Sequence, residues 1–486
     1  MDLQVFFLPF LTPGHMIPMV DLARLFARRG VKATIVTTAA NLPLIQPTTD
    51  LFNSSLSSRF HPIQILLLPF PSSESNLPQG QENLLYFATP AITQEFDTAI
   101  DMLSSPFKLL LRDHHPDCLI SDIFYSWSVD VGHEHGIPVF IFHGSSFFFT
   151  AVAGVMKSLK LDAFDDEEPF VVPGLPHRIE MTRAQLPGYI TRPSHSTGGM
   201  IRAYTESDGV VMNSFYDMEG DYIDLGKNSG LIKLWLVGPV SLHNRDDTDK
   251  AVRGNEASIS THECLNWLDT KKPRSVIYVC FGSLGRFPPA QLREIALGLE
   301  ASKYAFIWVE KYNKQLVDIL PEGFMSRAAS EGKGLVINGW APQLLILNHE
   351  AIGGFVTHCG WNSSLEGASS GVPMVAWPLF AEQCFNAKLL VDVLKVGVSV
   401  GVTRCSEREE ERTVVGREEV EKAVVELMGD GEEAEERRKR ARELREKARR
   451  AVEEGGSSYN EISRLIEHLL GLRAARVHRV NGLVDP

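Results

Sequence analysis

Short apolar runs alternate with amphipathic stretches along most of this 486-residue chain, and this alternation restricts the folds it can adopt. Near the N-terminus VFFLPF (5–10) is followed by IPMVDLARLFARRG (17–30) and then by ATIVTT (33–38). Apolar positions in the middle stretch recur at helical spacing, and Gly30 supplies a C-terminal stop. A strand, a helix and a second strand in this order predict parallel strands joined by a right-handed crossover.

Similar apolar runs recur through the rest of the chain. We predict further buried strands at 64–70, 117–124, 137–144, 209–215, 275–283, 306–310, 334–339, 353–358 and 373–378. Amphipathic stretches such as 289–302 separate the later runs. This pattern is typical of an α/β protein with doubly wound parallel sheets.

A polar segment divides the chain in two. Residues 241–260 are charged and poor in large apolar side chains, as is usual for a connection between domains. The chain is also longer than one ordinary core usually requires. We therefore predict an N-terminal domain over 1–245, a linker over 246–260 and a second domain over 261–456, with a ligand in the cleft between two Rossmann-like sheets.

The C-terminal region is strongly charged. Opposite charges three and four positions apart between 404 and 455 favour a solvated helix. Residues 457–472 show a second, more apolar helical pattern, whereas 473–486 have the character of a frayed, disordered tail.

Composition excludes several classes of protein. A net charge of −13 argues against nucleic acid as a partner and requires any anionic ligand to be held by local features. No run approaches the roughly 18 apolar residues of a membrane span, and the first apolar run lacks the basic flank of a signal peptide. The six cysteines are scattered, so we expect reduced thiols in a cytoplasmic protein. We also expect a monomer.

The segment WAPQLLILNHEAIGGFVTHCGWNSSLEGASSGVPMVAWPLFAEQ (340–383) places polar side chains at fixed positions around a glycine-rich turn. His358 ends a predicted strand, Gly360 permits a tight turn, and Asn362 or Ser363 is expected to cap the following helix. Unpaired N–H groups and a partial positive charge at a helix N-terminus form an anion site that needs no lysine.

This segment resembles the nucleotide-sugar motif of plant family 1 glycosyltransferases, which transfer a sugar from UDP to small hydrophobic molecules. The similarity covers nearly the whole chain, apart from the linker and the tail after 472. It implies the GT-B fold, in which two Rossmann-like domains face each other across a cleft and the final helix crosses back onto the N-terminal domain. It implies no cofactor beyond the co-substrate UDP-glucose, and a lipophilic small molecule as acceptor.

The resemblance also implies a donor site. Its members are Ser283, His358, Asn362 and Ser363 for the diphosphate, Gln343 and Glu366 for the ribose, Trp340 and Ala341 for the uracil, and Trp361, Glu382 and Gln383 for the sugar. Trp361 stands where glucuronosyl-transferring relatives tend to carry arginine, and Gln383 where some galactosyltransferases carry histidine. Both residues favour glucose, although Glu382 replaces the aspartate of many relatives.

A base must remove the proton of the attacking hydroxyl. His15 lies at the junction of the first strand and the first helix, where we expect the helix dipole to keep the ring neutral. TPGHMIPMVDLARLFA matches the family segment that bears the catalytic histidine. Asp122, at the end of another strand, matches the aspartate that orients it. The resemblance thus implies inverting, metal-free transfer that gives a β-linked product.

The acceptor is less well defined by the sequence. Candidate contacts are Phe124, His143 and Ala381, and aromatic clusters at 84–87, 124–125 and 147–149 suit a rigid apolar ligand. A steroid or triterpenoid, bare or already glycosylated, is our first hypothesis and a flavonoid the second. Alternatives are another sugar such as galactose, a carboxylic acid acceptor, and a non-catalytic protein that binds a lipophilic ligand. The His133-Glu134-His135 sequence lacks the spacing of a helical zinc site, so no metal site is predicted.

Overall fold

Two parallel sheets form the framework of the protein. The computed structural model describes residues 2–57, 60–86, 90–192, 195–228, 233–310 and 316–480. The first sheet has seven strands in the order β3-β2-β1-β4-β5-β8-β9, all paired in parallel. Its strands are β1 (Gln4–Leu8), β2 (Lys32–Thr38), β3 (Gln64–Leu68), β4 (Cys118–Asp122), β5 (Val139–His143), β8 (Gly209–Met212) and β9 (Leu234–Leu236).

The second sheet has six parallel strands in the order β12-β11-β10-β13-β14-β15. They are β10 (Val276–Cys280), β11 (Ala305–Glu310), β12 (Gly334–Asn338), β13 (Ile352–Thr357), β14 (Met374–Ala376) and β15 (Gly397–Ser399). In each sheet the strand order reverses beside its first strand, between β1 and β4 and between β10 and β13, and ligands of such sheets bind at this point. The predicted fold class, two doubly wound parallel sheets, is confirmed.

Helices cover these sheets. In the first half they are α1 (Pro13–Ala27), α2 (Leu42–Ser55), α3 (Pro90–Met102), α4 (Ser104–His114), α5 (Ser128–Glu134), α6 (Phe147–Met156), α7 (Gly188–Thr191), α8 (His195–Glu206) and α9 (Tyr216–Asn228). In the second half they are α10 (Asp247–Ala251), α11 (Thr261–Asp269), α12 (Pro289–Ser302), α13 (Leu316–Ile319), α14 (Phe324–Ser330), α15 (Gln343–Asn348), α16 (Trp361–Ser370), α17 (Gln383–Lys388), α18 (Arg417–Met428), α19 (Glu432–Val452) and α20 (Ser457–Val480).

Several short strands were not predicted. β9 and β15 have three residues each, as do β6 (Phe170–Val172) and β7 (Ile179–Met181), which pair as a small antiparallel sheet. Three residues are too few to establish a strand period in the sequence. The longer predicted strands all form, with ends that differ by a few residues.

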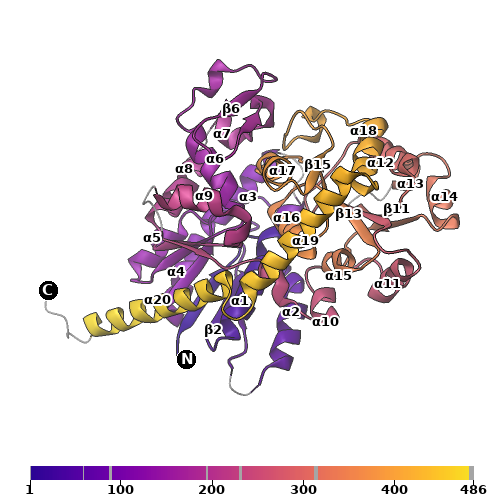
Figure 1. Cartoon of the computed structure of the whole chain (residues 1–486). Helices are drawn as coiled ribbons and strands as arrows, with labels where there is room; N and C mark the ends of the chain where they lie inside the picture. The colour runs from indigo at the N-terminus through magenta and orange to yellow at the C-terminus, as the bar shows by residue number, and fades with distance from the viewer. Residues whose placement is uncertain are drawn as a thin grey trace.

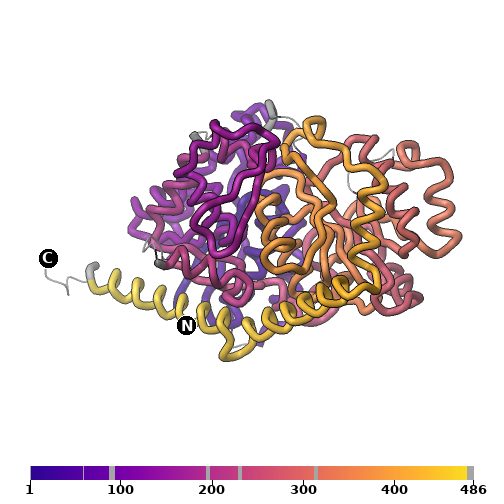
Figure 2. Tube along the Cα trace, turned by 45° about the horizontal axis from the view of Figure 1, so that its top comes forward, coloured from indigo at the N-terminus to yellow at the C-terminus, as the bar shows by residue number. Residues whose placement is uncertain are grey.

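The last helix of the chain packs back on the first half. Figure 1 shows the indigo-to-magenta and orange elements as two lobes, with the yellow helices α19 and α20 running from one to the other. Figure 2 shows the same two helices passing beneath both lobes. Apolar residues of α20, among them Leu465 and Leu469, are buried in the same core as β1 and α1. The last helix therefore ties the two halves together.

Helix α20 is longer than expected. Residues 473–480 continue the helix, so the prediction of a disordered tail from 473 is wrong for this stretch, and 481–486 lie outside the described residues. Arg473 and Arg476 contact the same Asp117 carboxylate, at 3.2 and 2.8 Å from its Oδ1 atom. These ion pairs stabilise the extra turns, and the sequence pattern offers no sign of them because the partner is more than 350 positions away.

The charged region also differs from the prediction of one solvated helix. α19 buries a narrow stripe that includes Ala441, Leu444 and Ala448, and it packs on α16. Residues 404–412 are not part of a regular helix beyond the turn at Glu409–Glu411. Small apolar residues spaced along one face explain how a helix so rich in charge still packs on the domain.

The expectation of six reduced cysteines is wrong as well. Cys384 at the start of α17 forms a disulfide with Cys405, whereas Cys118, Cys264, Cys280 and Cys359 are free and buried. Tertiary packing brings the bonded pair together over 21 positions, and no motif in the sequence marks it. Among the described residues, none of the helices combines the length and apolar character needed to cross a membrane.

Candidate active site

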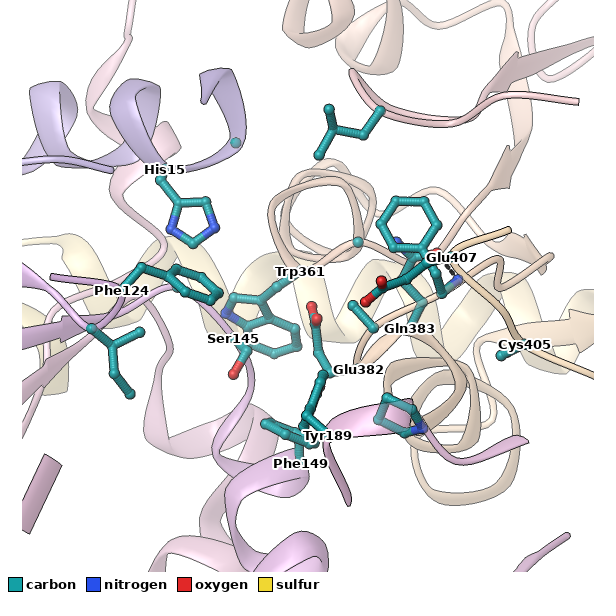
Figure 3. A pocket seen from close by; sticks show the side chains of 18 of the residues that line it. His15, Phe124, Ser145, Phe149, Tyr189, Trp361, Glu382, Gln383, Cys405 and Glu407 are labelled. Atoms are coloured by element: carbon teal, nitrogen blue, oxygen red, sulfur yellow. Dashed lines mark hydrogen bonds between the residues drawn. The ribbon is translucent and has the colours of Figure 1, made fainter. Parts of the chain in front are cut away.

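A large cleft opens where the carboxyl ends of the two sheets face each other. It encloses about 2760 Å³ and takes its lining from both halves of the chain. Figure 3 shows His15 and Phe124 on one side and Glu382, Gln383 and Tyr189 on the other. Since sites for one small molecule usually measure roughly 300–1,000 Å³, this cleft has room for two ligands together.

The structure brings the predicted site residues together. Those that line the cleft are His15, Phe124, His143, Ser283, Trp340, Ala341, Gln343, His358, Trp361, Asn362, Ser363, Glu366, Ala381, Glu382 and Gln383. Asp122, the remaining one, is fully buried and lies behind His15. Residues up to 368 positions apart in the sequence thus share one cavity because both switch points face it.

His15 and Asp122 meet at the switch point of the first sheet. His15 lies in the first turn of α1, and its Nδ1 atom is 2.7 Å from Oδ2 of Asp122. The other carboxylate oxygen accepts a hydrogen bond from the backbone N–H of Phe124 at 3.1 Å. Phe10 and Phe124 pack edge-on against the imidazole. With Nδ1 committed to Asp122, Nε2 is the nitrogen left to accept a proton.

The electrostatic setting of His15 differs from our expectation. Burial lowers the pKa of His15, but the adjacent Asp122 carboxylate and, more weakly, Glu382 outweigh burial and raise the pKa above 6.5. We expected the dipole of α1 to keep the ring neutral. A carboxylate in direct contact favours the protonated ring, so the pair makes His15 a stronger base instead.

Glu382 and Gln383 begin α17 across the cleft. Burial raises the pKa of Glu382, and Asn386 one turn later donates to its Oε1 atom at 3.3 Å. The Gln383 oxygen accepts from the backbone N–H groups of Leu379 and Phe380 at 2.9 and 3.2 Å. Gln383 is therefore oriented by the backbone, and its NH₂ group is what it can offer to a sugar hydroxyl.

Helix α16 presents its N-terminus to the cleft. The prediction that Asn362 or Ser363 caps it is wrong, because Gly360 holds the N-cap position and no side chain bonds there. Asn362 instead donates to the carbonyl of Gly14, next to His15, and Ser363 accepts from Gln343 at 3.3 Å. The N–H groups of the first turn are thus left for an anion such as a diphosphate.

Two glycines make room for His358, which follows β13. A Cβ atom on Gly282 would lie 2.4 Å from the imidazole, and one on Gly360 would lie 2.3 Å from it. Gly282 also has φ of +76°, which favours glycine. His358 is thereby held between the loop after β10, which carries Ser283, and the start of α16.

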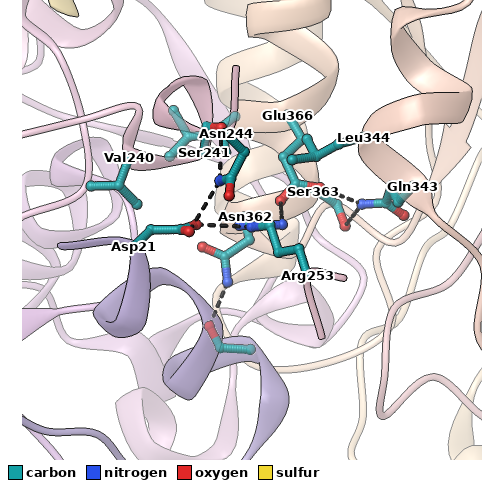
Figure 4. Close-up of polar contacts among 12 residues, drawn as sticks. Asp21, Val240, Ser241, Asn244, Arg253, Gln343, Leu344, Asn362, Ser363 and Glu366 are labelled. Atoms are coloured by element: carbon teal, nitrogen blue, oxygen red, sulfur yellow. Dashed lines mark hydrogen bonds and ion pairs between the residues drawn. The ribbon is translucent and has the colours of Figure 1, made fainter. Parts of the chain in front are cut away.

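A carboxylate suited to a ribose lies farther along α16. Glu366 accepts from Nε2 of Gln343 at 2.7 Å and from Nη1 of Arg253 at 2.6 Å. Figure 4 shows Arg253 reaching between Glu366 and Asp21. Sequence reasoning missed Arg253 because it assigned 246–260 to a linker, and a lone arginine in a charged segment gives no signal.

The wall of the cleft formed by the first half of the chain is more apolar. Phe124 is 43% exposed, and burial lowers the pKa of His143 to about 4, so this imidazole stays neutral. Trp361 is buried and donates from Nε1 to the carbonyl of Asn213 at 2.8 Å, which joins α16 to the end of β8. Phe149 of the predicted 147–149 cluster and Tyr189, which the sequence did not single out, lie beside Glu382 in Figure 3. Phe87 of the 84–87 cluster lies outside the described residues.

Comparison with known proteins identifies the family. Residues 244–416 match the family model described as UDP-glucoronosyl and UDP-glucosyl transferase. The chain is 47% identical over 97% of its length to UDP-glucosyl transferase 73M2 of Saponaria officinalis, covering 98% of that protein, and 46% identical over 96% to the scopoletin glucosyltransferase of Nicotiana tabacum, covering 98% of it.

Solved structures agree. A Glycyrrhiza uralensis enzyme, UGT73P12, complexed with glycyrrhetinic acid 3-O-monoglucuronide, is 40% identical with a TM-score of 0.92, over 99% of this chain and 98% of that one. Medicago truncatula UGT71G1, complexed with UDP-glucose, is 28% identical with a TM-score of 0.78, over 96% and 98% of the two chains. The protein belongs to the plant family 1 UDP-glycosyltransferases, with the GT-B fold. It is an enzyme that transfers a sugar from UDP, as its sequence predicted.

Proposed function

We propose that the protein transfers glucose from UDP-glucose to a hydroxyl group of a lipophilic plant metabolite, with inversion and without a metal ion. The observation that carries this proposal is the 2.7 Å contact between His15 and the buried Asp122 at the wall of a cleft that also holds Glu382 and Gln383. The pair supplies a base, and the opposite wall supplies groups for the sugar.

In the proposed reaction His15 Nε2 accepts the proton of the acceptor hydroxyl as its oxygen attacks the anomeric carbon. The bond from that carbon to the β-phosphate oxygen breaks, and UDP leaves with the bonding electrons. Asp122 stabilises the imidazolium that forms. Attack from the face opposite UDP converts an α-linked donor into a β-linked product.

The same arrangement favours a donor site without a metal. The uncapped N-terminus of α16 and His358 offer donors to the diphosphate, and Trp340 offers an indole face to the uracil. Gln383, fixed by two backbone N–H groups, suits a neutral hexose, and the buried Trp361 offers no positive charge to a sugar carboxylate. Glucose therefore fits these side chains better than glucuronic acid.

For the acceptor we propose a steroid or triterpenoid, bare or already glycosylated, before a flavonoid. The volume of the cleft and the apolar wall with Phe124 and Phe149 support a bulky, rigid molecule. Relatives act on varied acceptors, since they include a scopoletin, an abscisate and an anthocyanin glucosyltransferase. The solved neighbour UGT73P12 is complexed with a triterpenoid monoglucuronide, which supports an acceptor that already carries a sugar.

A matrix assay tests the proposal. Purified enzyme is combined with UDP-glucose, UDP-galactose, UDP-xylose or UDP-glucuronic acid and with a sapogenin, a triterpenoid glycoside or a flavonol, and products are read by mass. We expect a hexose adduct with UDP-glucose, a β-anomeric coupling in its NMR spectrum, and an unchanged rate after EDTA treatment. Faster turnover with another donor, or loss of activity on chelation, would overturn the respective part of the proposal.

A further inference from the structure

Arg253 joins the two domains through a single buried guanidinium. It follows α10 in the linker, and its side chain is 10% exposed. Nε donates to Oδ2 of Asp21 at 2.8 Å, and Nη1 donates to Oε1 of Glu366 at 2.6 Å. Asp21 belongs to α1 of the first domain and is 1% exposed, while Glu366 belongs to α16 of the second and is 4% exposed.

The chemistry of this bridge requires an arginine. Two carboxylates buried to this extent need a cationic partner, and a planar fork can bond both at once where one ammonium cannot. A second arginine, Arg24, serves the neighbouring carboxylate Asp249 at 2.6 Å and lies 3.6 Å from Asp21. Among the described residues, Arg253 is thus the cation that pairs directly with Glu366.

Glu366 keeps capacity for a ligand in this arrangement. Two carboxylate oxygens have about four acceptor positions, and Arg253 and Gln343 use one on each oxygen. The remaining positions can accept the hydroxyl groups of a ribose. Because both oxygens are already held, the carboxylate does not have to be ordered when a nucleotide binds.

The residues after Arg253 contact Trp340, the residue expected to stack on the uracil. Gly254 has φ of +96°, and a Cβ atom there would lie 2.4 Å from Cζ2 of Trp340. Ser258 donates from its N–H to the Trp340 carbonyl at 2.8 Å and accepts from the Trp340 N–H at 3.0 Å. The linker segment 253–258 therefore touches both Trp340 and Glu366.

From this geometry we propose that Arg253 is a positioning residue of the donor site. It fixes the Glu366 carboxylate, and the fixed carboxylate lets the enzyme select a ribonucleoside diphosphate over its 2′-deoxy analogue. The proposal rests on the proposed role of Glu366 toward the ribose. It assigns the interdomain linker a part in donor recognition. Through Asp21 it also sets the position of α1, the helix that carries His15, relative to the donor.

Calorimetric titration with UDP and with 2′-deoxy-UDP tests this role. We expect the wild type to bind UDP about tenfold or more tightly than 2′-deoxy-UDP, because a hydrogen bond to a charged group usually contributes this much affinity. The ratio of these two affinities measures the selection. In Arg253→Met this ratio should fall close to that of Glu366→Gln, while the affinity for 2′-deoxy-UDP changes by less than about threefold. In turnover, KM for UDP-glucose should rise and KM for the acceptor should not.

Controls separate this role from a structural one. Arg245→Met removes an exposed arginine just before the same linker and should keep the wild-type ratio. If Arg253→Met does not fold, Arg253→Lys keeps the charge without the fork, and we expect it to lose most of the preference. A wild-type ratio in either folded Arg253 variant would overturn the proposal. An unchanged ratio in Glu366→Gln would instead refute the ribose role of Glu366, and this inference with it.

Discussion

The Nδ1 atom of His15 lies 2.7 Å from Oδ2 of Asp122, a carboxylate without solvent exposure whose second oxygen is held by a backbone N–H. The ring is therefore fixed in one orientation by a partner 107 positions away. We expect His15→Ala to lose transfer by about 100-fold or more, because general base catalysis usually contributes this much.

Binding of UDP should persist in His15→Ala, since His15 is not assigned to the nucleotide. Asp122→Asn should lower kcat without unfolding the protein. The matched control is His262→Ala, which changes an exposed histidine on α11 and should behave as wild type. Initial rates together with UDP titrations measure both effects, and a His15→Ala enzyme that retains more than a few per cent of activity would contradict the assignment.

Activity should fall at acid pH with a midpoint above 6.5. Burial lowers the pKa of His15, but Asp122 and Glu382 raise it further, so the ring is protonated and unable to accept a proton over a wider acid range. Removal of the negative charge in Asp122→Asn should move the acid limb of kcat/KM toward lower pH, even as the rate drops. A pH–rate profile of both enzymes measures this shift, and a limb that stays in place would show that another group titrates.

Gly282→Ala should weaken donor binding. The added methyl group would lie 2.4 Å from the His358 imidazole, so the ring must move away from the start of α16. We expect KM for UDP-glucose to rise by about tenfold, which corresponds to roughly 1.4 kcal/mol. Gly401→Ala is the matched control because Gly401 also has positive φ, +93°, but open space where its Cβ would lie. Equal effects of the two changes would point to backbone strain rather than to His358.

Reduction of the Cys384–Cys405 disulfide should lower stability and alter the use of acceptors. A bond that closes a loop of this size usually stabilises by about 2–4 kcal/mol, which a thermal melt with and without a reductant will show. Residues 404–412 line the cleft, so their release should raise KM for the acceptor more than KM for UDP-glucose. In Cys384→Ser the reductant should have no further effect; a further drop in Tm would trace the change to something other than this bond.

Much of the site could be predicted because its residues follow strands. His15, Asp122, Ser283 and His358 each end a strand or follow one closely, and the carboxyl ends of parallel strands gather at one edge of a sheet. Local apolar patterns located the strands, and the resemblance to the glycosyltransferase family singled out these residues near their ends. The helix cap at Asn362 or Ser363 was wrong because Asn362 bonds to Gly14 instead, across the domain boundary.

The two parallel sheets, their order along the chain and the family could be predicted from the sequence, because strand and helix periods and the motif at 340–383 are local properties. The folded structure was needed to show that Arg253 bridges Asp21 and Glu366, that Cys384 bonds Cys405, and that burial opposed by the Asp122 carboxylate sets the pKa of His15. Each of these depends on side chains from distant segments meeting away from water, where a charge or a thiol takes its properties from its neighbours.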